Sequence, residues 1–238
     1  MMTYLMIWIA PVARLLVATI LVVCSAGVAL AQHEHSDVEF VFTDGKIDIE
    51  FGDEGQVFES EFDIDGTLEQ ETDDPGFASE TAEGLGVEPN ALIDYDVLGP
   101  LMYHNGSGFA TVPAGAQLVI GDNPSGELVV DAATVGPISG PGAIAQADSS
   151  GDVHTHIDFR LEPLTLSTGD YGAYGVLMQL TTDHAGVAAS DPFFLVFNFG
   201  LEEEEFEGAV GAFAAMVPEP ATGFWLAVVL LGPWFRRR

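Results

Sequence analysis

The sequence predicts an all-β fold, mainly antiparallel and β-sandwich-like, with one short C-terminal helix, between an N-terminal signal peptide and a C-terminal hydrophobic sorting helix. Short runs alternate between apolar and acidic residues, Gly- and Pro-rich turns separate these runs, and an apolar segment stands near each end of the chain. A period of two places the apolar side chains on one face of a strand, and many short strands between turns are typical of a sandwich. We therefore expect a signal peptide over residues 1–31, an acidic β-rich extracytoplasmic domain over 32–217, and a hydrophobic tail over 218–238.

Residues 1–31 have the features of a secretory signal peptide. Arg14 precedes an apolar run over residues 15–23, and Ala29 and Ala31 supply the small side chains that a signal peptidase recognises. Two alternatives are a lipoprotein attached through Cys24 and an uncleaved membrane anchor. In each case the chain is exported, and signal peptidase is a partner where the leader is cleaved.

The last part of the chain combines a proline motif, a short apolar run and a basic end. It comprises Pro218, Glu219 and Pro220, the apolar residues 221–235, and Arg236, Arg237 and Arg238. As a helix the apolar run would span about 22 Å, which is short for a hydrocarbon core of about 30 Å. The arginines would stay on the cytoplasmic side and stop transfer.

This order of parts resembles the PEP-CTERM sorting signal of bacteria that make exopolysaccharide, and the resemblance covers residues 217–238 only. It implies that an exosortase-type enzyme recognises the proline motif and processes the tail. It also implies transient anchoring in the inner membrane and delivery to the cell surface or extracellular matrix, where exopolysaccharide is a candidate partner. The alternative is a plain C-terminal membrane anchor.

The charge balance is strongly acidic, with 37 acidic residues against 6 basic ones. Only Lys46 and Arg160 lie within residues 32–217, and that part of the chain has no cysteine. Such a surface repels phosphate backbones, so we expect no nucleic-acid partner. It should attract cationic surface partners and divalent cations such as Ca²⁺ or Mg²⁺, while disulfides and thiol chemistry are excluded.

Residues 38–65 predict an antiparallel meander with an acidic outer face. Apolar residues alternate with acids through three runs, and Asp44-Gly45 is a favoured two-residue hairpin turn between the first two. The turn over residues 52–55 should lead back into a third neighbouring strand. Carboxylates that lie side by side on the outer face repel one another, and a bound divalent cation would relieve that repulsion.

The rest of the domain predicts further strands and one helix. We expect strands over residues 93–97, 117–120, 127–131, 152–161, 174–181 and 193–199, a loop over 136–151, and a helix over 202–215. The almost wholly apolar run 193–199 should be buried on both faces. The helix has glutamates in its first turn, which suits a positive N-terminus, and an apolar stripe that includes Phe206, Val210 and Phe213.

A candidate metal site lies on the predicted strand over residues 152–161. His154 and His156 share one face, with Cα atoms roughly 6.6–6.8 Å apart, and Asp158 follows on the same face. Two imidazoles at this spacing can bind one metal ion, and Asp158 could add an oxygen ligand or orient one of the histidines. The donor set suits zinc or copper. Arg160 on the same face argues against a cation there, and two ordinary exposed histidines are the alternative.

Other candidate ligands are more scattered. His33-Glu34-His35 could bind copper or nickel near a processed N-terminus, and His104 and His184 could join a site only through tertiary contacts. Asp63-Ile64-Asp65 begins like a calcium loop but departs from the EF-hand pattern at Thr67 and Leu68. Further acidic candidates, without defined spacing, are Asp73, Asp74, Asp94 and Asp96.

No catalytic motif stands out. The chain has no G-x-S-x-G, phosphate-binding loop or H-E-x-x-H. We expect a non-enzymatic surface or matrix protein that displays an acidic β domain, with divalent cations and exopolysaccharide as its candidate ligands. The alternatives are a zinc- or copper-binding protein that uses His154, His156 and Asp158, and a carboxylate-dependent glycan hydrolase.

Overall fold

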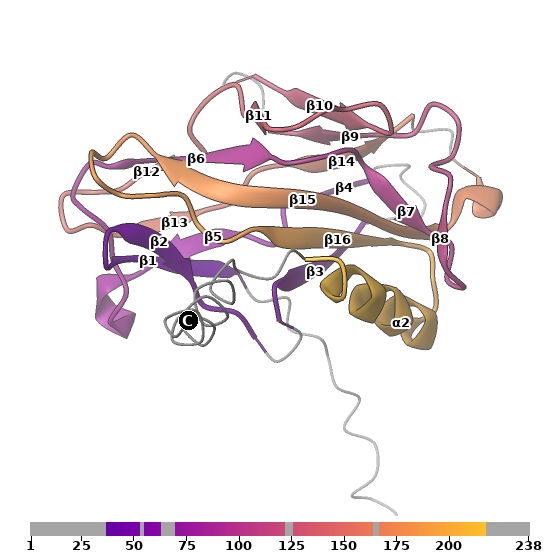
Figure 1. Ribbon diagram of the computed structural model, residues 1–238, viewed down its shortest axis with the longest axis horizontal. Helices are drawn as coiled ribbons and strands as arrows, with labels where there is room; N and C mark the ends of the chain where they lie inside the picture. The colour runs from indigo at the N-terminus through magenta and orange to yellow at the C-terminus, as the bar shows by residue number, and fades with distance from the viewer. Residues whose placement is uncertain (1–36, 53–54, 63–69, 122–125, 164–166, 218–238) are drawn as a thin grey trace, which may run out of the picture. The chain divides into compact units, whose positions relative to one another are not determined.

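The computed structural model describes residues 37–52, 55–62, 70–121, 126–163 and 167–217. These residues form three β-sheets and one α-helix (Figure 1). The mainly antiparallel all-β prediction and the single helix are confirmed for these residues. Some predicted features lie outside them: the leader with Ala29 and Ala31, His33 and His35, Asp63 and Asp65, and the tail with Pro218, Glu219, Pro220, Arg236, Arg237 and Arg238. No helix among the described residues is long and apolar enough to span a membrane.

The largest sheet has eight strands, with β11, β6, β15, β16 and β3 side by side in that order and shorter strands at its margins. Its strands are β3 (Val57–Glu61), β6 (Leu92–Val97), β7 (Met102–His104), β8 (Phe109–Ala110), β11 (Ile138–Ser139), β12 (Ala145–Gln146), β15 (Gly172–Thr182) and β16 (Phe193–Phe199). The long β15–β16 hairpin forms its centre (Figure 1).

Each of the other two sheets has four strands. One has the order β13-β5-β1-β2, with β1 (Val38–Thr43), β2 (Lys46–Ile49), β5 (Phe77–Ser79) and β13 (Val153–Thr155). The other has the order β10-β9-β14-β4, with β4 (Glu71–Thr72), β9 (Gln117–Ile120), β10 (Leu128–Asp131) and β14 (Phe159–Glu162). Two short 3₁₀ helices are η1 (Thr81–Glu83) and η2 (Thr168–Asp170).

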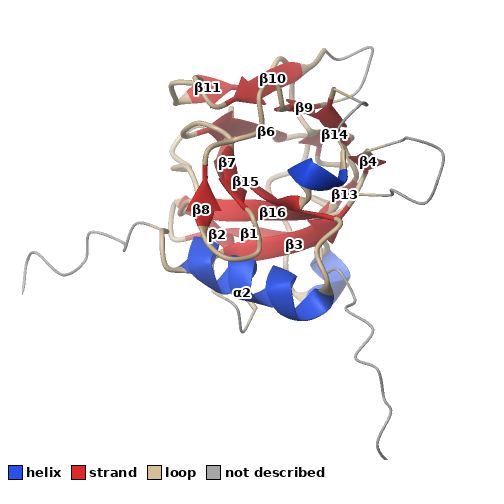
Figure 2. Cartoon of the chain, turned by 90° about the vertical axis from the view of Figure 1, so that its right-hand side faces the viewer, coloured by secondary structure: helices blue, strands red, loops and turns tan. Residues whose placement is uncertain are grey.

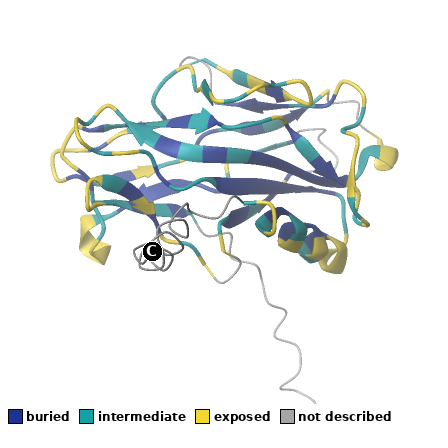
Figure 3. Cartoon of the chain, in the orientation of Figure 1, coloured by how far each residue is buried: buried dark blue, intermediate teal, exposed yellow. Residues whose placement is uncertain are grey.

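One apolar cluster contains side chains from all three sheets. Phe77 of β5, Phe159 of β14 and Phe197 of β16 are fully buried in it, and the rings of Phe159 and Phe197 are 5.0 Å apart. The eight-stranded sheet therefore packs on both smaller sheets, which is consistent with a β-sandwich. Figure 3 shows the buried residues concentrated along these strands.

Strand β16 is buried on both faces, as its apolar run predicts. Phe193, Leu195 and Phe197 face the main cluster, while Phe194 and Val196 belong to a second cluster. That second cluster includes the buried face of helix α2 (Glu203–Ala214), which covers the outer side of the eight-stranded sheet (Figure 2). The predicted helix and its apolar residues Phe206, Val210 and Phe213 are confirmed.

Both predicted hairpins form. Strands β1 and β2 pair antiparallel across Asp44 and Gly45, whose φ angles of 51° and 76° are both positive, as a type I′ turn requires. Strands β9 and β10 also pair antiparallel. Within the predicted loop over residues 136–151, β11 and β12 add short edge pairings to β6.

The predicted meander is wrong at its third strand. Strand β3 does not pair with β2 but runs parallel to β16, with Val57 opposite Phe194. Val57 and Phe58 are adjacent and both buried, one in each apolar cluster, because β3 lies beside the doubly covered β16. A strand that faces water on one side would not place two apolar neighbours inside.

The predicted single strand over residues 152–161 is also wrong, because it divides into β13 and β14. Strand β13 pairs with β5, whereas β14 pairs with β9 and β4 in a different sheet. Residues 156–158 connect the two, and inward-facing side chains still alternate through Val153, Ile157 and Phe159. The alternation of inward- and outward-facing side chains therefore continues where the chain passes from one sheet to the other.

Candidate metal centre

The two histidines of the predicted metal site lie side by side at one margin of the β13-β5-β1-β2 sheet. His154 lies on β13 opposite Ala78 of β5, and His156 follows directly after the strand. Their ring centroids are 5.7 Å apart, and their side chains are 54% and 36% exposed. The pair is therefore accessible to an ion from solvent.

Asp37, which the sequence analysis did not single out, completes the cluster. It immediately precedes β1, which runs parallel to β5 and so reaches the same margin as β13. Ligand atoms of Asp37, His154 and His156 all lie within 4.8 Å of one another, and Asp37 Oδ2 is 3.5 Å from His154 Nε2. Two ligands of one tetrahedral zinc ion are about 3.4 Å apart, so this pair already has the right spacing.

Oxygen acceptors fix the orientation of both imidazoles. His154 Nδ1 lies 2.9 Å from Glu80 Oε1, and His156 Nδ1 lies 2.9 Å from the backbone carbonyl of Asp73. A carbonyl or carboxylate oxygen only accepts, so each Nδ1 carries the hydrogen. The neutral rings therefore keep an unprotonated Nε2, which is the arrangement typical of histidines that bind metals.

Gly76 holds the carboxylate and one imidazole close together. Its backbone N–H donates to Asp37 Oδ1 over 3.2 Å. A Cβ atom at this position would lie 2.7 Å from Asp37 Oδ1 and 2.7 Å from His156 Cε1. Only glycine leaves room for the cluster, and its N–H leaves Asp37 Oδ2 to face His154.

Two further acids lie on the other side of His156. Asp73, Asp74 and His156 form a second group of ligand atoms within 4.8 Å, and Asp74 Oδ1 is 3.6 Å from His156 Nδ1. Because His156 Nδ1 already donates to the Asp73 carbonyl, these acids lie outside the three-ligand cluster. They add negative charge next to it.

The surrounding charge is strongly negative. The hydrogen bond with Glu80 raises the pKa of His154, desolvation lowers it, and the charges of Asp37, Glu80 and Glu83 raise it further, so that the net shift is upward. Partial burial raises the pKa of Glu39, as do Glu83, Glu50, Asp37 and Glu80. A bound cation would offset this repulsion.

Asp158, predicted as the third ligand, does not join the cluster. It lies in the connection between β13 and β14, where its backbone carbonyl accepts from Gly121 N over 2.9 Å. Arg160 belongs to the next sheet and pairs with Glu127 and Glu162, each at 3.1 Å. Because the strand divides, the objection that Arg160 would repel a cation bound by the histidines loses its basis.

The other candidate ligands in the described residues stay apart from this cluster. His104 is buried at the end of β7, its Nδ1 accepts from Gly106 N, and burial lowers its pKa. His184 lies near the ring of Phe42. Asp94 lies near Asp96 and Asp183, a group without histidine in which burial and then the two neighbouring carboxylates raise the pKa of Asp94.

No family model matches this chain, and neither curated proteins nor solved structures show significant similarity to it. The geometry therefore defines the class of site on its own: an open cluster of two imidazoles and one carboxylate on a β-sheet margin. Nitrogen and oxygen ligands of this kind suit zinc and copper, and three protein ligands leave a position for water or another group.

Proposed function

We propose that this chain is an exported cell-surface protein whose acidic β domain binds zinc or copper through Asp37, His154 and His156. The observation that supports this proposal is the paired orientation of the two imidazoles. Each Nδ1 is engaged by an oxygen acceptor, and the ligand atoms of the three residues lie within 4.8 Å. The domain binds and displays the metal rather than catalysing a reaction.

Zinc titration of the full chain in detergent tests this function. We expect one ion per chain to survive dialysis, and His154→Ala or His156→Ala to weaken binding by more than about 100-fold, since each removes a direct ligand. Asp158→Asn is the matched control, because Asp158 is near in sequence but outside the cluster. Equal zinc binding by wild type and His154→Ala would contradict the proposal.

The route to the cell surface rests on the two ends of the chain. The leader and the PEP-CTERM-like tail support export and processing by an exosortase-type enzyme. Replacing Pro218, Glu219 and Pro220 by alanine should leave the precursor with its tail uncut in the inner membrane. Intact precursor found soluble in the cytosol would contradict this part of the proposal.

A second candidate function is display of an acidic surface that binds Ca²⁺ or Mg²⁺ weakly. The raised pKa values of Glu39 and Asp94 favour it, because burial and then neighbouring carboxylates raise both. In this case millimolar Ca²⁺ should raise the melting temperature equally in wild type and His154→Ala. A melting temperature that is the same in chelator and in millimolar Ca²⁺ would exclude this second function.

A further inference from the structure

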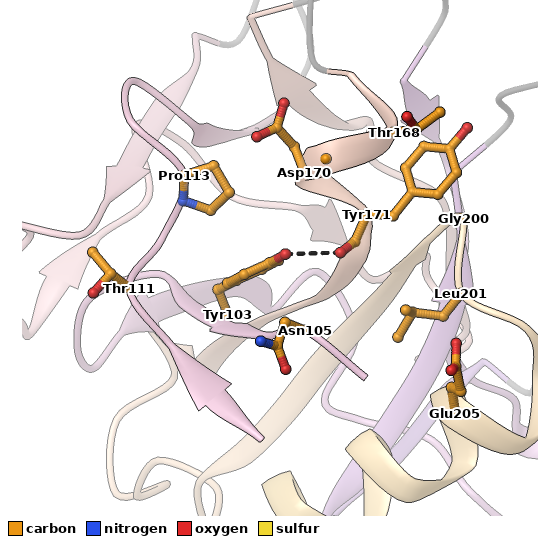
Figure 4. Close-up of a pocket in the computed structure, with 11 residues that line it drawn as sticks. Tyr103, Asn105, Thr111, Pro113, Thr168, Asp170, Tyr171, Gly200, Leu201 and Glu205 are labelled. Atoms are coloured by element: carbon orange, nitrogen blue, oxygen red, sulfur yellow. Dashed lines mark hydrogen bonds between the residues drawn. The ribbon is translucent and has the colours of Figure 1, made fainter. Parts of the chain in front are cut away.

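A cavity of about 600 Å³ lies where three segments of the chain meet, and none of its lining residues belongs to the metal cluster (Figure 4). The segments are the β7–β8 region with the residues that follow it, η2 with Tyr171 directly after it, and the connection from β16 into α2. Its volume lies within the range of about 300–1,000 Å³ that is typical of small-molecule sites.

Two tyrosines form a fixed part of the wall. The Tyr103 hydroxyl donates to the Tyr171 carbonyl over 2.7 Å, which ties the first segment to the second (Figure 4). The Tyr171 ring packs edge-on against Phe199 at 5.3 Å and lies against Gly200, where a Cβ atom would come within 2.7 Å of the ring. The wall is therefore set before any ligand arrives.

The η2 turn is held in place independently. Ser167 Oγ accepts from Gly169 N, and Ser167 N donates to Asp170 Oδ2 over 2.8 Å, which together make a capping box. Both hydrogen bonds from Ser167 to the Asp170 carboxylate use Oδ2. Asp170 Oδ1 makes neither of these bonds, and we assign it as an acceptor for a ligand.

The chemistry of the lining selects the class of ligand. Hydroxyl, amide and carboxylate groups surround the cavity together with tyrosine rings, and none of the described residues that line it is a lysine or an arginine. Carboxylates accept hydrogen bonds from hydroxyl groups, hydroxyls and amides donate and accept, and a tyrosine ring offers an apolar face with a polar edge. Burial and then the charge of Asp170 raise the pKa of Tyr103, which keeps its hydroxyl protonated.

We propose that this cavity binds a neutral sugar unit of a polysaccharide. A polyhydroxylated ring satisfies the acceptors of Asp170 and Glu205 and packs its carbon face on a tyrosine. Uronic acids and sulfated sugars are disfavoured, because the two carboxylates repel them and no basic side chain stands among the described lining residues to offset that repulsion. The proposal is independent of the metal cluster and of its function.

Calorimetric titration of the full chain with neutral and anionic oligosaccharides tests this site, in a detergent that has no sugar headgroup. The neutral probes are pentasaccharides of glucose, mannose, galactose and xylose, and the anionic probe is oligogalacturonate. We expect at least one neutral probe to bind and the anionic probe to bind at least about tenfold more weakly. Binding of none of the neutral probes, or equal binding of the anionic one, would overturn the proposal.

Variants locate the binding to the cavity. Thr111 is exposed at the cavity wall, so Thr111→Trp should fill the space and weaken neutral-sugar binding at least about tenfold. Thr43→Trp, at an exposed end of β1 away from the cavity, is the matched control and should bind as wild type. Unchanged binding of the neutral sugar by Thr111→Trp would overturn the assignment of the sugar to this cavity. Zinc binding by the same variant should stay as in wild type, which separates this test from the metal proposal.

Discussion

The metal cluster and the sugar cavity are built in opposite ways. The cluster draws both histidines from one short stretch, His154-Thr155-His156, and adds Asp37, which precedes β1, two strands away from β13 in the same sheet. The cavity draws its lining from three segments between residues 103 and 205 that meet only in the folded chain. Local spacing can indicate the first kind of site, whereas the second exists only through tertiary structure.

The interactions that stabilise the metal cluster and the cavity differ as well. The cluster is open to solvent. Glu80 and the Asp73 carbonyl accept hydrogen bonds from the two histidines, and Gly76 N–H donates to Asp37, so that all three groups are oriented. The cavity depends on packing: α2 carries Glu205 and is held to the eight-stranded sheet by the second apolar cluster. Substitutions in that packing should therefore damage the cavity first, and substitutions around the histidines should affect metal binding most.

The largest expected effect is that of Phe213→Ala. Phe213 is fully buried between α2 and β16, with its ring 5.1 Å from that of Phe194. Removing it should lower the free energy of unfolding by about 3–5 kcal/mol, as measured by denaturant melts. We expect neutral-sugar binding to weaken in the folded protein while zinc binding stays close to wild type.

Phe109→Ala is the matched control for this packing. Phe109 contacts the same Phe213 ring at 5.0 Å but is 43% exposed, so its removal should cost less than half as much. Equal destabilisation by the two variants would show that the second apolar cluster does not hold α2 in the way described.

The next largest effect is that of Gly76→Ala. The added methyl group would lie 2.7 Å from both Asp37 Oδ1 and His156 Cε1, so one of these groups must move. Because both atoms belong to the ends of side chains that can rotate away, the cost should lie at the low end of the range of about 1–3 kcal/mol typical of overpacking. Zinc affinity should fall because the cluster is displaced. In Gly52→Ala the new methyl group meets nothing within 4 Å, so that variant should melt and bind zinc as wild type. Wild-type zinc affinity in Gly76→Ala would contradict the proposed geometry.

How much of the fold the sequence predicts depends on how far apart in the sequence the interacting residues lie. The Asp44-Gly45 hairpin, the doubly buried β16 and the helix α2 are set by neighbours in sequence, and all three were predicted. The partner of β3 and the division between β13 and β14 depend on which distant strand lies alongside, and both were predicted wrongly.

The metal ligands show the same limit. The two-residue spacing of His154 and His156 indicated the pair, but proximity in sequence favoured Asp158 over Asp37 as the third ligand. Asp37 reaches the histidines because β1 pairs parallel with β5. With 37 acidic residues in the chain, nothing in the sequence distinguished Asp37 from the others.

A smaller effect is expected from Glu80→Ala. Glu80 does not belong to the three-ligand cluster but accepts the His154 Nδ1 hydrogen over 2.9 Å. Loss of such an outer partner typically weakens metal binding about 10–100-fold, which zinc titration would measure. Asp152→Ala is a suitable control, because Asp152 accepts from the backbone of η1 and contacts neither histidine. Equal loss in both variants would indicate a general charge effect.

The smallest effect concerns Asp94, whose group contains carboxylates but no histidine. Burial, Asp183 and Asp96 raise its pKa in the folded protein, so ionising Asp94 disfavours the folded state. The stability associated with protonated Asp94 is complete below the unfolded pKa of 3.8 and is lost as the pH rises through the higher folded pKa. At pH 7, Asp94→Asn should raise the melting temperature by about 2 °C.

Melts at two pH values check this expectation. The gain from Asp94→Asn should disappear near pH 3, where Asp94 is protonated in both states. Millimolar Ca²⁺ should reduce the gain at pH 7 by screening the same repulsion, while His154→Ala should leave it unchanged. A gain of equal size at pH 3 and pH 7 would show that Asp94 is not held at a raised pKa.

The central claim is that one metal ion is bound by His154, His156 and Asp37. X-ray absorption at the zinc edge of the zinc-loaded full chain tests it most directly, with the His33→Ala/His35→Ala variant to exclude binding at the N-terminal histidines. We predict a first shell of two imidazole nitrogens and oxygen ligands that the double variant retains and that His154→Ala loses. A shell without imidazole, or one lost only in the His33→Ala/His35→Ala variant, would contradict the account.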